Sequence, residues 1–89
     1  MTNMNTMIND CIGANLVLLE RRLWSATITA RSARDAMRNG QRNLAIGTAL
    51  PLERELHVAT ALYQTIIALH RMPAETITQT ARDGGAPCL

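Results

Sequence analysis

Eight apolar residues in the first half of the chain recur at alternating spacings of four and three positions. They are Ile12, Leu16, Leu19, Leu23, Ala26, Ala30, Ala33 and Met37. A heptad of this kind is typical of a helix whose apolar line packs against a partner helix. It predicts one long helix, and it indicates that the protein acts through what this line and its neighbours bind.

The types of apolar residue also favour helices. The 89-residue chain has no Phe, one Trp and one Tyr, whereas Ala and Leu are abundant. Ala and Leu are strong helix formers that suit closely packed helices, and a chain of this length is near the lower limit for a self-sufficient core. We therefore expect an all-α fold, an antiparallel, coiled-coil-like two-helix hairpin with a short C-terminal helix, completed by oligomerisation or by a partner.

Polar, proline and glycine-rich stretches divide the chain into four predicted segments. These are a flexible N-terminus at 1–9, a helical hairpin at 10–72, a short helix at 73–83 and a disordered tail at 84–89. The tail prediction comes from a cluster of Asp, Gly and Pro that breaks regular structure.

Within the hairpin, the first helix is predicted from about residue 14 to 39. Gly40 fits the left-handed position that ends a helix. Residues 40–49 are expected to form the connection, and the second helix to run over 49–71 until Pro73 stops it. Two helices alone leave part of each apolar face uncovered, so we expect further helices from a second copy or from another protein.

The predicted partner-binding residues come from both helices of the hairpin. They are Leu16, Leu19, Leu23, Trp24, Ala26, Ala30, Leu62 and Ile66. Two readings stay open for the small residues: Ala26, Ala30 and Ala33 could form a groove for a partner helix, or could pack the second helix closely. Trp24 should lie at the border of the apolar face, where it either anchors an interface or covers the edge of the core.

Three arginines form a candidate face for an anionic partner. Arg31, Arg34 and Arg38 are spaced to share one side of the helix, and Arg42 extends them into the connection. A phosphate or an acidic protein could bind there. Asp35, however, lies within this face at a spacing that can pair with Arg31 and Arg38, and no aromatic residue is expected between the arginines, so a solvated face is the alternative.

No residue set points to catalysis, a metal or a cofactor. His57 and His70 are 13 residues apart and point to different sides of a helix, so they cannot form a metal pair. Cys11 and Cys88 form no metal- or redox-type motif. No secretion signal or membrane-spanning stretch is recognised, so we expect a cytoplasmic protein with reduced thiols that is not an enzyme and does not act at a membrane.

The second half of the chain carries a motif pattern of its own. Met37-Arg38-Asn39-Gly40 ends the first helix, and Leu56 and the run Ala-Leu-Tyr-Gln-Thr-Ile-Ile-Ala-Leu at 61–69 follow the loop. Over about residues 16–72 this pattern resembles the small type III secretion co-chaperones of the YscE/PscE/SsaE group. The resemblance implies a cytoplasmic heterodimer with a tetratricopeptide-type chaperone, which together keep the secreted needle subunit from polymerising early.

Two other functions fit the same sequence. The first is a homodimeric four-helix bundle that binds RNA or DNA through Arg31, Arg34, Arg38 and Arg42 of both copies. The second is a phage or mobile-element inhibitor of a host protein, which needs only a binding face.

Overall fold

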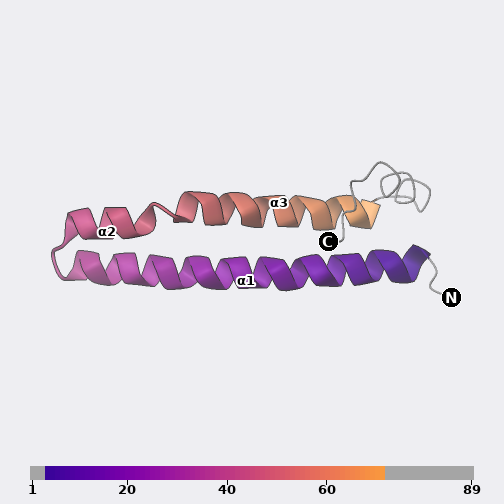
Figure 1. Cartoon of the computed structure of the whole chain (residues 1–89), viewed down its shortest axis with the longest axis horizontal. Coiled ribbons are helices and arrows are strands. Elements are labelled where there is room, and N and C mark those ends of the chain that lie inside the picture. The colour runs from indigo at the N-terminus through magenta and orange to yellow at the C-terminus, as the bar shows by residue number, and fades with distance from the viewer. Residues whose placement is uncertain (1–3, 72–89) are drawn as a thin grey trace. The chain divides into compact units, whose positions relative to one another are not determined.

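The chain is all-α, as predicted. The computed structural model describes residues 4–71, and nearly all of them lie in three helices. These are α1 (Met4–Arg38), α2 (Arg42–Ala49) and α3 (Leu52–Arg71) (Figure 1). No strand occurs within this described range. The predicted helix at 73–83 and the predicted tail at 84–89 lie outside it.

The helices contribute to two compact units. Among the described residues, unit 1 combines 4–19 of α1 with 61–71 of α3, and unit 2 is the continuous stretch 20–60. Unit 2 therefore contains the remainder of α1, the whole of α2 and the start of α3.

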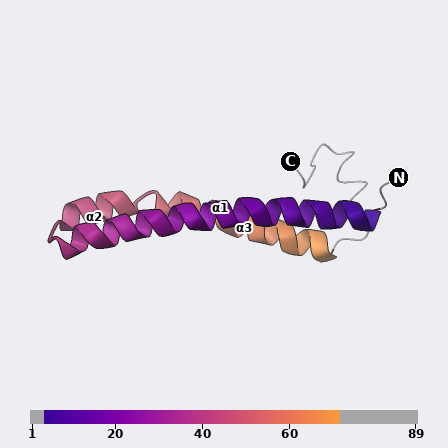
Figure 2. The same cartoon turned by 90° about the horizontal axis from the view of Figure 1, so that it is seen from below.

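The chain reverses direction inside unit 2 through a Schellman turn. The Gln41 N–H donates to the Ala36 carbonyl at 2.9 Å, and the Gly40 N–H donates to the Met37 carbonyl at 3.0 Å. Gly40 has φ 76°, a left-handed conformation that glycine adopts without the steric penalty of a Cβ. The predicted end of the first helix is thus confirmed, and α2 returns beside the last turns of α1 (Figures 1 and 2).

We expect Gly40→Ala to lower the free energy of unfolding by about 1 kcal/mol, because an L-residue is strained in the left-handed region. Gly47→Ala is the matched control. Gly47 lies within α2 without a positive φ, and a Cβ added there would meet nothing within 4 Å. Ala should raise stability at that position by about 0.5–1 kcal/mol. Chemical denaturation followed by circular dichroism compares the two variants, and equal effects would contradict the assignment of the turn.

The segment predicted as a connection is itself helical, which is a correction. Residues 42–49 form α2, although the Gln41 side chain makes no capping hydrogen bond. Pro51 separates α2 from α3 because it has no N–H to continue the helical ladder. Its carbonyl instead accepts the Glu55 N–H at 3.1 Å, so α3 follows directly, close to the predicted second helix.

The first helix also begins earlier than predicted. α1 starts at Met4, within the segment expected to be a flexible N-terminus. The reason lies in unit 1, where Cys11 and Leu69 form a buried cluster. Met4 and Ile8 pack against this cluster, so tertiary packing stabilises a stretch whose Asn and Thr residues have weak helix propensity.

Candidate protein-binding surface

Unit 2 has small apolar residues inside and large ones outside. Its buried apolar residues are all alanine: Ala26, Ala36, Ala45 and Ala59. Leu52 and Val58 are half-buried, and eight other large apolar side chains are between 46% and 69% exposed. They are Leu23, Trp24, Ile28, Met37, Leu44, Ile46, Leu50 and Leu56, which we call the unit 2 apolar surface. Isolated exposed apolar residues are ordinary, but a surface richer in large apolar groups than the interior is typical of a binding site.

The apolar line recognised in the sequence is divided between the two sides of α1. Half of its members are buried or half-buried, namely Ile12, Leu19, Ala26 and Ala33, and the other half are exposed, namely Leu16, Leu23, Ala30 and Met37. A second line with seven-residue spacing is also turned inward. Its members Ile8, Asn15, Thr29 and Ala36 are buried or half-buried, and its middle member, Arg22, is exposed. The contact line of α1 therefore combines the inward half of the predicted line with this second line. The exposed half of the predicted line lies outside the contact.

Polar residues can occupy this second line because several of them have polar partners. The Asn15 side chain is buried, and its amide donates to the Cys11 carbonyl at 2.8 Å. Arg22 Nη1 donates to Glu55 Oε1 of α3 at 3.3 Å. This ion pair was not predicted, although the seven-residue spacing from Asn15 to Arg22 could have indicated that Arg22 lies near the interior.

Glu55 was not recognised as an interior residue. Only 18% of its side chain is exposed, whereas the Arg22 side chain is 45% exposed. Glu55 Oε2 is fully buried and has no hydrogen-bond partner among the described residues. A carboxylate placed in this way depends on its one cation, so Arg22 and Glu55 hold α1 and α3 in a defined register within unit 2.

The predicted partner-binding residues occupy different environments. Leu16, Leu23, Trp24 and Ala30 are exposed on α1. Leu19, Leu62 and Ile66 are half-buried, and Ala26 is buried. The side chain of Ala26 therefore serves the packing of unit 2, whereas Leu23 and Trp24 are accessible within that unit.

The side of α1 opposite the interior of unit 2 carries a mixed apolar and basic surface. Trp24, Ile28, Arg31, Arg34 and Arg38 follow one another at helical spacings of three or four residues and are all exposed, and we call them the Trp24 face. Trp24 is 58% exposed. It lies on the outward side of the helix rather than at the border predicted for it.

An aromatic ring lies among the arginines, contrary to expectation. The guanidinium carbon of Arg31 is 5.9 Å from the centroid of the Trp24 ring, at the outer limit of a cation–π contact. Asp35 also pairs differently from the prediction, because its Oδ1 accepts from Nε and Nη2 of its neighbour Arg34 at 3.2 and 3.1 Å. No acidic partner of Arg31 or Arg38 is found in residues 4–71.

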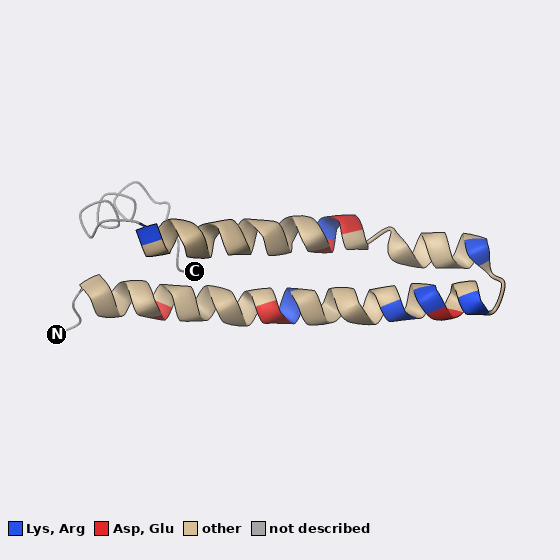
Figure 3. Ribbon diagram, turned by 180° about the vertical axis from the view of Figure 1, so that it is seen from behind, with Lys and Arg blue, Asp and Glu red and all other residues tan. Residues whose placement is uncertain are grey.

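Positive charge gathers in unit 2 near its turn. Figure 3 shows Arg residues in the last turns of α1 and at the start of α2, where Arg42 lies. The Trp24 face contains three arginines, and the adjacent Asp35 leaves this surface with a net charge of +2. Carboxylates of a partner would be attracted to it, since Arg forms bidentate pairs with them.

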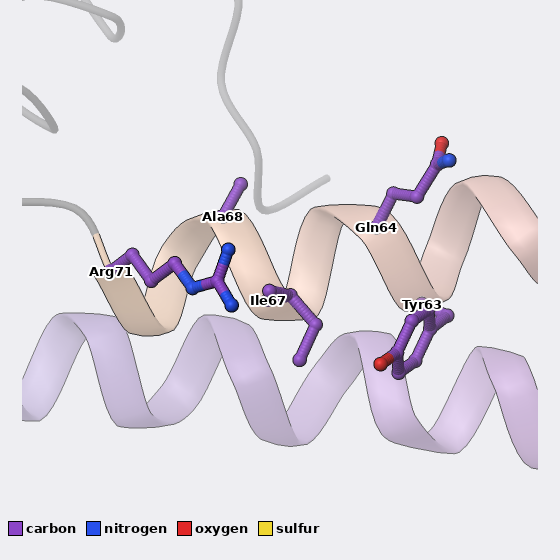
Figure 4. Close-up of a pocket in the computed structure, with 5 residues that line it drawn as sticks. All are labelled: Tyr63, Gln64, Ile67, Ala68 and Arg71. Carbon is purple, nitrogen blue, oxygen red and sulfur yellow. The ribbon is translucent and has the colours of Figure 1, made fainter.

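A shallow hollow in the described part of unit 1 is formed by a single helix. Tyr63, Gln64, Ile67, Ala68 and Arg71 of α3 line it (Figure 4). In the close-up, the side chains of Tyr63 and Ile67 point toward α1, whereas those of Gln64 and Ala68 point away from it. This open arrangement does not provide the convergent polar groups of an active site.

Cys11 departs from the expectation of reduced thiols, because it is disulfide-bonded. The other cysteine of the sequence, Cys88, lies outside the described residues. Among residues 4–71, no group of three or more His, Cys, Asp or Glu side chains is placed to hold a metal ion. No helix in that range combines the length and apolar character needed to cross a membrane.

No protein-family model matches the chain, and neither a curated protein nor a solved structure matches it. The function is therefore inferred from the side chains of this protein itself.

Proposed function

We propose that this protein is a small helical protein-binding module, which covers an apolar helical surface of a partner with its own. One observation carries the proposal: the buried apolar residues of unit 2 are all alanine, while eight large apolar side chains remain about half exposed. Burial of apolar area gives about 25 cal/mol per Å², so covering these exposed side chains would stabilise the complex with a partner helix.

The finer proposal is a co-chaperone in a cytoplasmic heterodimer. Its support is the sequence pattern over residues 16–72, which resembles the type III secretion co-chaperones, together with exposed Leu23 and Trp24 in unit 2. In that case the partner is a tetratricopeptide-type chaperone bound with a secreted subunit. A stable pair of this kind buries about 1,600 Å² in total.

The homodimeric nucleic-acid-binding bundle remains the second candidate. The observation that favours it is the Trp24 ring beside Arg31, because an aromatic ring among arginines can stack a base. The whole chain has a net charge of +2, which is low for a nucleic-acid-binding protein.

The proposed function predicts that Leu23→Asp combined with Leu56→Asp weakens partner binding by at least about tenfold, equivalent to about 1.4 kcal/mol. Both side chains are about half exposed, so helicity should be retained. The immobilised chain is exposed to a lysate of its source organism, and retained proteins are quantified by mass spectrometry. Circular dichroism verifies that the variant is folded.

Arg54→Gln is the control, because Arg54 is exposed on α3 and leaves the unit 2 apolar surface unchanged. A protein retained by wild type and by the control but lost by the double variant supports the proposal. A discrete homodimer by light scattering, with no protein retained in this variant-dependent manner, overturns it in favour of a self-contained bundle.

A further inference from the structure

We infer that the Trp24 face docks a helix of a partner protein. The side of that helix in contact with the face carries apolar residues at one end and acidic residues at the other. The inference rests on the proposed function and adds the chemistry of the partner. It concerns residues 24–38 of α1, all of which lie in unit 2.

The length and direction of the face define the shape of its partner. From Trp24 to Arg38 the helix rises about 21 Å at 1.5 Å per residue, which matches about four turns of a second helix. The first part of the face is apolar, with Trp24 and Ile28, and the second part is basic, with Arg31, Arg34 and Arg38. A complementary helix therefore has its apolar residues at one end and its carboxylates at the other.

The pairing within the face leaves two arginines for a partner. Asp35 is held by Arg34 through two contacts. Arg31 and Arg38 have no acidic partner among the described residues, and Arg31 already lies beside the Trp24 ring. A carboxylate bound to Arg31 would therefore lie next to the apolar anchor, so that charge and apolar burial act in the same interface.

A second copy of the chain fits this face poorly. A twofold contact centred on Arg31 places Arg31 against Arg31, Arg34 of one copy against Ile28 of the other, and Arg38 against Trp24. The arginines of each copy would then lose water without gaining a carboxylate partner, which disfavours association. A nucleic acid fits less well than an acidic helix, because Ile28 offers no stacking surface and the net charge of the face is small.

Trp24 is the one tryptophan of the chain, so its fluorescence reports occupancy of the face directly. Two synthetic helical peptides of about four turns serve as probes. Both carry Leu on one side at one end, and they differ only in having Glu or Lys at the other end. We expect the Glu peptide to shift Trp24 emission to shorter wavelength and to bind at least about tenfold more tightly than the Lys peptide.

The charge variant combines Arg31→Gln with Arg38→Gln. It should lower the affinity for the Glu peptide by about tenfold and reduce the salt dependence of its binding. Arg54→Gln with Arg71→Gln is the matched control. It removes the same charge from outside the Trp24 face and should retain the wild-type affinity. Each variant is compared with its own fluorescence in the absence of peptide.

Equal affinity for the two peptides, or unchanged affinity in the charge variant, overturns the inference. The inference is also overturned if single-stranded DNA binds more tightly than the Glu peptide, as measured by quenching of Trp24 fluorescence. That result would favour the nucleic-acid candidate. An emission shift that depends on protein concentration without any peptide also overturns the inference, since a second copy would then occupy the face.

The lysate experiment separates this inference from the proposed function. If the retained partner is lost with the Leu23→Asp and Leu56→Asp variant but kept by the charge variant, protein binding stands and the Trp24 face is not the site. If no protein is retained in a manner that depends on Leu23 and Leu56, the proposed function itself fails.

Discussion

Leu69→Ala is expected to lower the free energy of unfolding by about 2–5 kcal/mol, the usual range for removing a buried leucine side chain. Leu69 is 1% exposed and packs with Cys11 in the buried cluster of unit 1. The loss combines the removed apolar contact with the cavity that remains. Urea denaturation followed by circular dichroism measures it, and the transition should move to lower denaturant at an unchanged slope.

Leu16→Ala is the matched control, since Leu16 belongs to the same unit and is about half exposed. We expect its effect to remain within about 0.5 kcal/mol. If the two substitutions destabilise the protein equally, Leu69 does not hold the place in the core that the structure gives it.

Arg22→Ala is expected to lower stability by about 2 kcal/mol, because it removes the cation beside a largely buried carboxylate. The estimate is kept below that of a fully buried pair since the Arg22 side chain is 45% exposed and water screens it. Thermal and chemical unfolding of the single variant measure the loss. Arg21→Ala, at the adjacent exposed position, should leave stability nearly unchanged.

A double-mutant cycle isolates the interaction between the two side chains. Arg22→Ala, Glu55→Ala and the combined variant are compared, and the combined loss should be smaller than the sum of the single losses by at least about 0.5 kcal/mol. Additive losses would show that the 3.3 Å contact contributes nothing to the register of the helices.

The sequence was sufficient to predict the helical class and the main helices because their signals are local. Gly40 marked the end of the first helix, and Pro51 and Pro73 bracketed the second. α2 escaped prediction because Gly47 lies within it and Gln41 gives no capping signal. The early start of α1 at Met4 depends on packing against Leu69, which lies far along the chain and leaves no local trace.

The candidate surface was only partly accessible from the sequence. Periodicity identified exposed Leu16 and Leu23, but it could not distinguish the inner from the outer edge of a broad apolar stripe. That choice depends on which polar residues find partners across the interior, as Arg22 does with Glu55. The position of Arg31 beside Trp24 likewise depends on side-chain conformations that spacing alone does not determine.

The division into units has a consequence for the order in which the protein folds during synthesis. Unit 2 is continuous, so its interior can close as soon as residue 60 has left the ribosome. Unit 1 joins Cys11 to Leu69, and its interior has to wait until the second of these has been made. Throughout that interval Ile8 and Ile12 lack the helix against which they pack in the folded protein. The earliest residues of the nascent chain are therefore the ones most exposed to misassociation.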